Sequence, residues 1–352
     1  MPVLAAARGW QSFLRGLKGT LWGIFFIPLF LFCGKEEIKR CNFEERALWS
    51  EFISYTSVKS SFPYIRENGY SIYLAIQENF IGDPALLDLL KTAEKMGIKI
   101  GAWILLSYDE GYWPNEKNAE GFLRAVKKFV QWKEEENFEI ERIIVDMEPS
   151  YNRMKSLEEA FSRRDIWFVL NDLLQSINPS EFSYAKSIFK NLVDWLHRKG
   201  IKVMVTTSPF LIDDLYDGDE DISDALDTPV YGIDWDVVSF MVYRSLFKNF
   251  IGIMSPYITY SYSESATSFF GERTAIDLGV TGEDYGKREI EEDLKTLCFL
   301  GISKFHIYSL DYISTLPDPS SFLKFQLTPE APPPYAFFSM IRTLIQSIDK
   351  GL

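Results

Sequence analysis

The sequence contains little of what a disulfide scaffold, a zinc site or a nucleic-acid-binding surface needs. The chain of 352 residues has 3 cysteines and 2 histidines, and 50 acidic residues outnumber 37 basic ones. Three cysteines in so long a chain exclude a disulfide-based scaffold, and so few soft ligands give no recognisable zinc site. A net charge of −13 argues against nucleic-acid binding, because neutralising phosphates requires a basic surface. We therefore expect no metal, no cofactor and no nucleic-acid partner.

Two further patterns are missing, and what is present points to a large folded domain. No Gly-x-Gly-x-x-Gly follows the early strand-like runs, which disfavours a dinucleotide-binding sheet. No apolar run reaches the roughly 20 residues that a membrane-spanning helix needs. Hydrophobic residues make up 47% of the chain and aromatic residues 16%, enough to offset the entropy of ordering and to exclude disorder.

The N-terminal segment has the pattern of an export signal. Arg8, Arg15 and Lys18 precede a short apolar run at 21–32, and positive charge followed by such a run is typical of signal peptides. The run ends at Cys33, the place at which a bacterial lipoprotein carries its lipidated cysteine, although Phe32 stands where a small residue is usual. We expect residues 1–35 to be a signal peptide or lipoprotein-type anchor and 36–48 a tether. The protein would then be exported, in the cell envelope or secreted, and would touch a membrane only through this anchor.

Export would place the chain in a compartment where disulfides can form. Cys41 and Cys298 could pair there. Because cysteines so far apart in sequence are more often unpaired, we expect both thiols to be free.

Beyond the tether, short apolar runs alternate with amphipathic helical segments. The predicted strands are 51–57, 71–77, 98–107, 142–148, 201–208, 236–243, 273–280 and 304–310. They are nearly continuous apolar runs, as buried parallel strands are. Three joints, at Gly97, Gly200 and Gly301, take a helix through a glycine directly into a strand. This pattern predicts an α/β fold, a single-domain (β/α)8 TIM barrel over residues 49–352, and we expect it to be a monomer.

The fourth strand carries the most informative residues. Alternate side chains of a strand share a face, so Ile144, Asp146 and Glu148 should point into the barrel lumen. Active sites of such barrels lie at the C-terminal ends of the strands. Two carboxylates there, one residue apart, should repel one another and raise a pKa, which a general acid at neutral pH requires. The alternative is a structural acidic pair neutralised by cationic side chains or backbone N–H groups.

Three motifs in order along the chain resemble glycoside hydrolase family 18, the chitinases and related hexosaminidases. The segment RIIVDMEP (142–149) resembles the fourth-strand signature Asp-x-x-Asp-x-Asp-x-Glu. VVSFMVYRS (237–245) resembles the sixth-strand Met-x-Tyr-Asp segment through Met241 and Tyr243, and FHIYSLDY (305–312) resembles an eighth-strand segment in which Trp-Ser-Leu-Asp is common.

The resemblance implies a reaction and a role for each matching residue. Glu148 would protonate the glycosidic oxygen and then activate water. Asp146 would orient the substrate's N-acetyl group, whose carbonyl oxygen attacks the anomeric carbon, and Tyr243 would donate a hydrogen bond to that group. Tyr308, at the tryptophan position, would stack beneath the sugar. The implied activity is retaining, substrate-assisted hydrolysis of a glycan that contains N-acetylhexosamine.

Departures from the family pattern keep two alternatives open. Glu141 and Ile144 stand where the family has its two earlier aspartates, and Arg244 replaces the aspartate after the sixth-strand tyrosine. One alternative is a barrel that binds glycans without cleaving them. The other is a glycosidase with two protein carboxylates, in which Asp277 or Asp311 joins Glu148.

Further residues complete the expected site. Aromatic rings stack on sugars, so Tyr112 and Trp113 are candidate walls of the substrate site, whereas Trp103 is expected in the core. Met241, Arg244 and Asp311 are candidate substrate-binding residues because they lie in the matching segments. The acidic run Asp213–Asp224 lacks the ligand spacing of an EF-hand, and we expect a solvated loop there.

Overall fold

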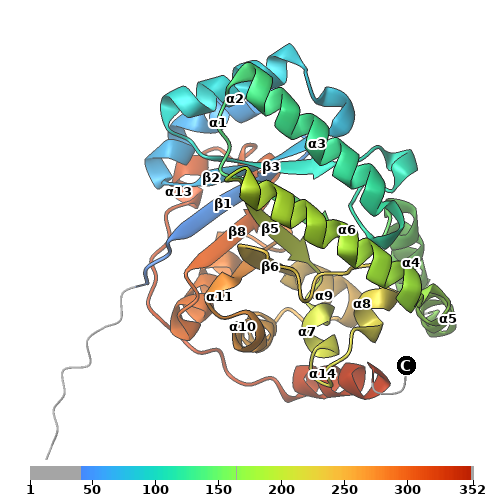
Figure 1. Cartoon of the computed structure of the whole chain (residues 1–352). Helices are drawn as coiled ribbons and strands as arrows, with labels where there is room; N and C mark the ends of the chain where they lie inside the picture. Colours follow the sequence, from blue (N-terminus) through green and yellow to red (C-terminus); the bar gives the residue numbers. More distant parts are fainter. Residues whose placement is uncertain (1–40, 164, 350–352) are drawn as a thin grey trace, which may run out of the picture. The chain divides into compact units, whose positions relative to one another are not determined.

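The computed structural model describes residues 41–163 and 165–349 (Figure 1). The predicted export segment, its lipidation at Cys33 and residues 36–40 of the predicted tether lie outside these residues. Within the described ranges, no helix combines the length and the apolar character needed to cross a bilayer.

Eight parallel strands close into a barrel in sequence order, with β1 paired to both β2 and β8. The strands are β1 (Glu45–Ser50), β2 (Ser71–Gln77), β3 (Ile100–Leu105), β4 (Arg142–Met147), β5 (Lys202–Thr207), β6 (Val237–Val242), β7 (Thr274–Leu278) and β8 (Lys304–Tyr308). The predicted (β/α)8 TIM barrel is therefore confirmed, and seven of the eight predicted strands overlap the observed ones.

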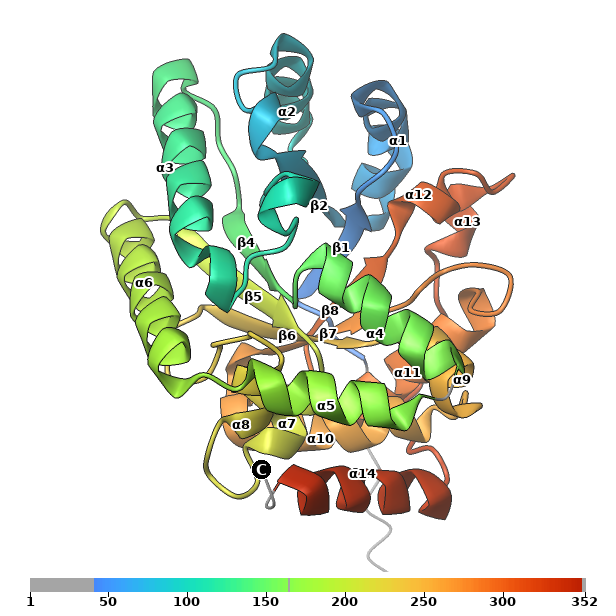
Figure 2. The same cartoon turned by 90° about the vertical axis from the view of Figure 1, so that its right-hand side faces the viewer.

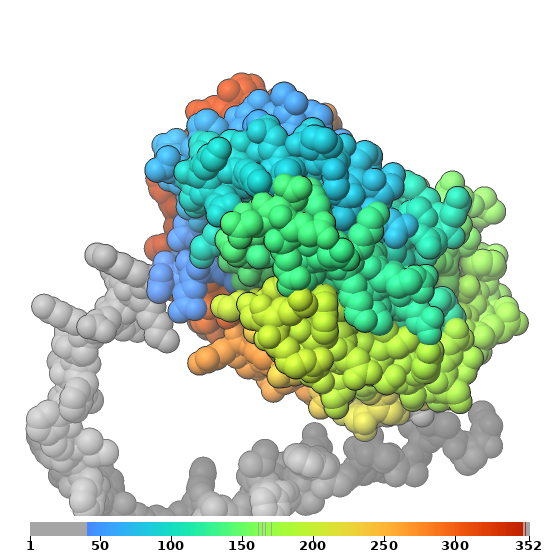
Figure 3. Space-filling view, turned by 45° about the horizontal axis from the view of Figure 1, so that its top comes forward, coloured from blue at the N-terminus to red at the C-terminus, as the bar shows by residue number. Residues whose placement is uncertain are grey.

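Helices surround the strands (Figures 1 and 2). Those that follow strands on the outside are α1 (Tyr55–Asn68), α2 (Pro84–Met96), α3 (Ala119–Glu136), α6 (Pro179–Arg198), α10 (Tyr257–Phe270) and α11 (Lys287–Leu300). The others are α4 (Tyr151–Arg163), α5 (Ile166–Ser176), α7 (Phe210–Asp214), α8 (Asp221–Ala225), α9 (Arg244–Ile251), α12 (Leu310–Ile313), α13 (Pro319–Phe322) and α14 (Ala336–Asp349). Figure 3 shows the outer surface, where green α3 lies beside yellow-green α6.

Local sequence signals explain where the outer helices begin and end. Asp83 caps α2 by accepting bonds from the backbone N–H groups of Ala85 and Leu86, and Pro84 occupies the first turn. Gly97 ends this helix at φ +70°, a conformation that favours glycine. The chain then enters β3 directly, as the repeated joints predict.

The first predicted strand is wrong. Residues 51–57 form the turn after β1 and the start of α1, and β1 itself begins at Glu45, within the predicted tether. Ser54 caps α1 by accepting a bond from Ser57 N–H at 3.2 Å. This cap decides the structure of a segment whose aromatic and β-branched residues favour a strand.

Alternation along the strands divides the interior into two cores. Ile143, Val145 and Met147 pack in the large core between strands and helices, whereas Ile144 lies in the lumen core. The predicted two faces of β4 are therefore confirmed. The lumen is tightly filled: a Cβ added to Gly101 would come within 2.7 Å of the Tyr73 ring.

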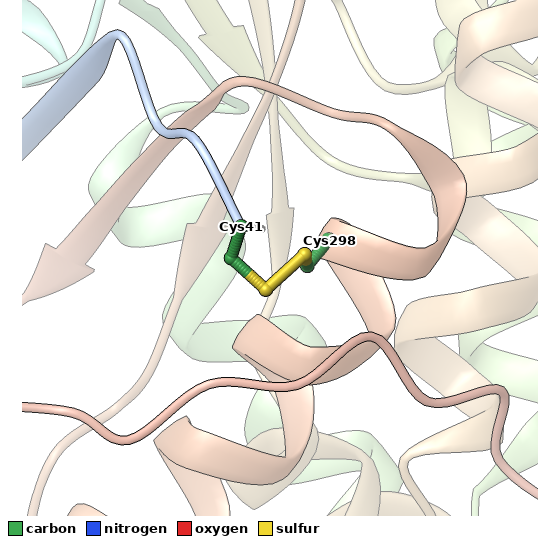
Figure 4. Close-up of a disulfide and its surroundings, with 2 residues drawn as sticks. All are labelled: Cys41 and Cys298. Carbon is green, nitrogen blue, oxygen red and sulfur yellow. A yellow bond between two sulfur atoms is a disulfide. The ribbon is translucent and has the colours of Figure 1, made fainter. Parts of the chain in front are cut away.

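A disulfide joins Cys41 to Cys298, with Cα atoms 5.2 Å apart (Figure 4). The expectation of two free thiols is thus wrong. Cys41 lies four residues before β1 and Cys298 lies near the end of α11, before β8. Because β1 and β8 pair to close the barrel, the fold brings together two cysteines that are far apart in sequence.

Candidate active site

The site is built at the C-terminal end of β4, where Asp146 and Glu148 meet. Asp146 is buried on the lumen face, and Glu148 follows the last residue of the strand. Burial, and then the charges of Glu51 and Glu158, raise the pKa of Glu148 to about 8. Burial and the charge of Glu148 also raise the pKa of Asp146 well above its usual value, and the two carboxyl groups hydrogen bond to each other. A pKa of about 8 keeps Glu148 protonated at neutral pH, which suits a general acid, and the raised pKa of Asp146 favours its protonated form.

Two tyrosines lie near this pair of carboxyl groups. Tyr243 follows β6 and Tyr308 ends β8, and their rings lie 5.9 Å apart with a tilt of 34°. Burial first, and then the negative charges of Asp277, Asp146 and Glu148, raise the pKa of the Tyr243 phenol, so it stays protonated. Its hydroxyl is available to donate a hydrogen bond beside the two carboxyl groups.

Glu51 is a third carboxylate at the site, and it was not predicted from the sequence. It follows β1 and accepts hydrogen bonds from the Tyr112 hydroxyl at 2.8 Å and from the Tyr308 hydroxyl. Its negative charge contributes to the raised pKa values of both Asp146 and Glu148. A correct first strand would have revealed it, because Glu51 is then the residue after a barrel strand, where active sites lie.

Asp311 binds the backbone of the turn that carries Glu51. Its oxygens accept bonds from the backbone N–H of Glu51 at 3.2 Å and of Phe52 at 2.8 Å, and from the Ser50 hydroxyl at 3.3 Å. The carboxylate thus fixes the turn after β1. Contact of Asp311 with substrate stays a prediction.

A buried polar network fills the lumen beneath the site. His306 contacts Asp277 at 2.7 Å through Nδ1 and Glu45 at 3.0 Å through Nε2, and Glu45 pairs with Arg142 at 2.7 Å. Burial lowers the pKa of His306, but the bonds to Asp277 and Glu45 outweigh it and raise the pKa. The raised pKa favours the charged imidazole beside these two buried carboxylates.

Asp277, on β7, brings a further carboxylate close to Asp146. Ile144, at a motif-aspartate position, is apolar and lies in the lumen core. Asp277, from β7, contributes negative charge near Asp146 and raises its pKa. Asp277 itself is fully buried and accepts bonds from Trp49 Nε1 at 3.1 Å and from the Thr206 hydroxyl. With these partners and His306, it has no free face for a substrate.

Four aromatic rings form a wall beside the carboxylates. Tyr112 and Tyr108 stack at 4.4 Å with an interplanar angle of 2°, Trp113 packs edge-on against Tyr112, and Tyr151 of α4 contacts all three. Tyr112 has φ +66°, an unusual conformation for a bulky residue, and it aims the hydroxyl at Glu51. Tyr151 was missed because the sequence shows only a polar insertion there. Trp103 is buried in the lumen core, as predicted.

The remaining predicted residues divide between the site and the helix layer. Met241 lies on the lumen row of β6 beside Asp277 and is partly exposed. Arg244 is buried and points to α11, where its guanidinium bonds Asp293 at 2.8 Å. Its expected role in substrate binding is wrong, because its charge is used inside the protein.

No protein-family model matches the chain, and no curated protein matches its sequence. Solved structures do match the fold. A chitinase from Chromobacterium violaceum has a TM-score of 0.50 and 11% identity, covering 79% of this chain and 97% of that one. The glycoside hydrolase domain of PgaB from Bordetella bronchiseptica has a TM-score of 0.49 and 10% identity, covering 79% and 98%. The chain thus has a TIM-barrel fold similar to that of this chitinase, with its own set of residues at the strand ends.

Proposed function

We propose that the protein is an exported glycoside hydrolase that cleaves an N-acetylhexosamine-containing glycan with retention of configuration. The observation that carries this proposal is the buried Asp146–Glu148 pair at the end of β4, in which the pKa of Glu148 is raised to about 8, beside the Tyr243 hydroxyl. The Cys41–Cys298 disulfide supports export, because such bonds persist in oxidising compartments.

In the proposed first step, Glu148 donates its proton to the glycosidic oxygen as the bond to the anomeric carbon breaks. The substrate's acetamido oxygen attacks that carbon from the opposite side and forms a cyclic intermediate. Asp146 and the Tyr243 hydroxyl hold the acetamido group in place for this attack. In the second step the Glu148 carboxylate takes a proton from water, and the water oxygen opens the intermediate with overall retention.

The contacts of the other carboxylates argue against a protein nucleophile. Asp277 is fully buried and fully bonded, and Asp311 binds the backbone of the β1–α1 turn. Glu51 has one tyrosine hydroxyl on each oxygen. Tight binding of a thiazoline-type inhibitor, which mimics the cyclic intermediate, would support substrate assistance over a two-carboxylate mechanism.

The decisive variant is Glu148→Gln. We expect it to lower kcat on aryl N-acetylhexosaminides by about 10²–10⁴-fold, the usual contribution of a general acid, while sugar binding and fold persist. Glu159→Gln removes the same charge from an exposed position on α4 and should leave kcat unchanged. Full activity in the Glu148→Gln protein would refute the assignment.

A glycan-binding barrel without catalysis is the second candidate. It is favoured by Ile144, which places an apolar side chain beneath Asp146 where the family motif has an aspartate. Measurable turnover of any glycan by the wild-type protein, lost in Glu148→Gln, would eliminate this candidate.

A further inference from the structure

Three carboxylates from distant parts of the chain meet on the side of the barrel covered by α14. They belong to Asp214 at the end of α7, Asp219 in the loop before α8, and Asp349 at the end of α14. One oxygen of each lies within 4.8 Å of the other two. The acidic run was predicted to be a solvated loop, which is wrong for the buried Asp213, Asp214 and Asp224, although residues 216–219 are exposed.

Asp349 is the unusual member of this group. Its side chain is only 2% exposed, and neither carboxylate oxygen has a hydrogen-bond partner. Within residues 41–163 and 165–349, no Lys, Arg or His pairs with Asp214, Asp219 or Asp349. A buried carboxylate without a partner is costly, and such groups are usually paired or bound to a metal.

Local charge adds to this cost. Burial, followed by the negative charge of Asp214 and of the acidic loop, raises the pKa of Asp349 to about 8. Burial also raises the pKa of Asp214 to about 6, although it accepts bonds from Ile222 N–H and Ser223 N–H at 2.9 Å each. Asp214 Oδ2 also accepts a bond from the Ser223 hydroxyl, whereas Oδ1 accepts only the bond from Ile222 N–H and keeps a lone pair for a further ligand.

The C-terminal helix is held so that Asp349 must face this group. Arg342 pairs with Asp213 at 2.6 Å, and Gln346 donates to the same carboxylate at 3.0 Å. Because Arg342, Gln346 and Asp349 lie four and three residues apart, they share one face of α14. Figure 2 shows this helix running beside α7.

We propose that Asp214, Asp219 and Asp349 bind a divalent cation, Ca²⁺ by its preference for carboxylate oxygens, which joins the last helix to the loop after β5. Ca²⁺ takes 6–8 oxygen ligands at about 2.3–2.6 Å, so two ligands of one ion lie up to about 5 Å apart. The spacing of the three oxygens fits this range. Water can fill the remaining positions because Asp219 is exposed. This site is separate from the glycosidase proposal and does not depend on it.

The test measures binding of CaCl2 to the metal-stripped full chain by titration calorimetry, together with thermal unfolding with and without the ion. We expect one site per chain and a rise in Tm of about 5 °C at saturating CaCl2, reversed by EDTA. MgCl2 at equal ionic strength should bind more weakly, since Mg²⁺ demands shorter, octahedral contacts.

Variants distinguish a Ca²⁺ site formed by these three carboxylates from non-specific attraction of the ion to an acidic surface. Asp219→Asn, at an exposed position that should not disturb folding, is expected to weaken Ca²⁺ binding at least about 10-fold, and Asp349→Asn likewise. Asp221→Asn removes the same charge two residues away and keeps the bond from the Asp221 backbone N–H to Asp219, so it should change binding less than about 3-fold. The proposal is overturned if the wild-type chain binds neither ion, or if all three variants bind as the wild type does or are weakened equally.

Discussion

The protonation of Glu148 depends on its neighbours, and their contributions can be separated by mutation. Burial is the largest cause of its raised pKa, followed by the charges of Glu51 and Glu158. Glu51 also holds two tyrosines, whereas Glu158 is exposed on α4. Glu158 therefore offers a way to change the charge near Glu148 without changing its contacts.

We expect kcat/KM to fall as pH rises through about 8, because deprotonated Glu148 cannot act as the acid. In Glu158→Gln a negative charge is lost, the Glu148 carboxylate becomes less unfavourable, and its pKa falls. The basic limb of the pH–rate profile should then move to lower pH by roughly half a unit. Glu159→Gln, the neighbouring charge, should leave the limb in place, and equal shifts in both variants would contradict this account.

The same raised pKa affects stability. Because the folded-state pKa of Glu148 lies above the unfolded value of 4.5, folding favours the protonated form, and stability is lost as pH rises toward 8. Glu148→Gln cannot ionise and avoids this loss. Its Tm should exceed that of the wild type at pH 9, and the difference should shrink at pH 5. An equal difference at both values would show that Glu148 ionises normally.

At the level of elements, the β1–α1 turn carries Glu51, a residue of the candidate active site, directly after a strand of the barrel wall. Asp311 binds the backbone N–H groups of Glu51 and Phe52. In Asp311→Asn only one side-chain oxygen remains to accept these bonds, so Glu51 should be held less firmly. We expect a loss of about 1–2 kcal/mol in the free energy of unfolding and a basic limb of kcat/KM shifted to lower pH.

Asp83→Asn provides the matched comparison, because asparagine caps a helix about as well as aspartate. It should leave both stability and pH profile close to the wild type. If Asp311→Asn lowers stability but leaves the pH profile unchanged, Asp311 supports the fold alone and does not position Glu51.

Elements with strong local signals could be predicted, whereas β1 was misplaced and a residue of the site was missed with it. Gly97 and the Asp83-Pro84 start place α2 in the sequence because capping is local. Residues 51–57 carry strand-like side chains, and only the Ser54 cap reveals the helix start. The six-residue error in β1 concealed Glu51, whose place at a strand end makes it a site residue. Asp146 and Glu148 were found because β4 alternates cleanly between its two cores.

Contacts between distant strands could not be predicted from local pattern. The sequence shows that Ile144 replaces an acidic residue, but only barrel closure brings Asp277 of β7 near Asp146 of β4. The same holds for His306, whose two carboxylate partners come from β1 and β7. Arg244 was predicted to bind substrate because it lies in a motif segment, and only the fold brings it to its partner Asp293, 49 residues away. Long-range pairing thus decided which charged residues remained free for a ligand.

At the scale of the whole barrel, the disulfide is expected to stabilise the fold without contributing to the active site. Cys41 and Cys298 precede the two strands that close the barrel, so the bond lies at the N-terminal end of the β1–β8 seam. Residues at that end of a TIM barrel affect stability, whereas catalysis belongs to the opposite end. Replacing both cysteines by serine should lower the free energy of unfolding by about 2–4 kcal/mol, measured in guanidinium chloride, and leave kcat unchanged. Reducing the wild type with dithiothreitol should give the same loss and should not affect the double variant. A variant that loses activity while it remains folded would show that closure of the seam also shapes the catalytic end.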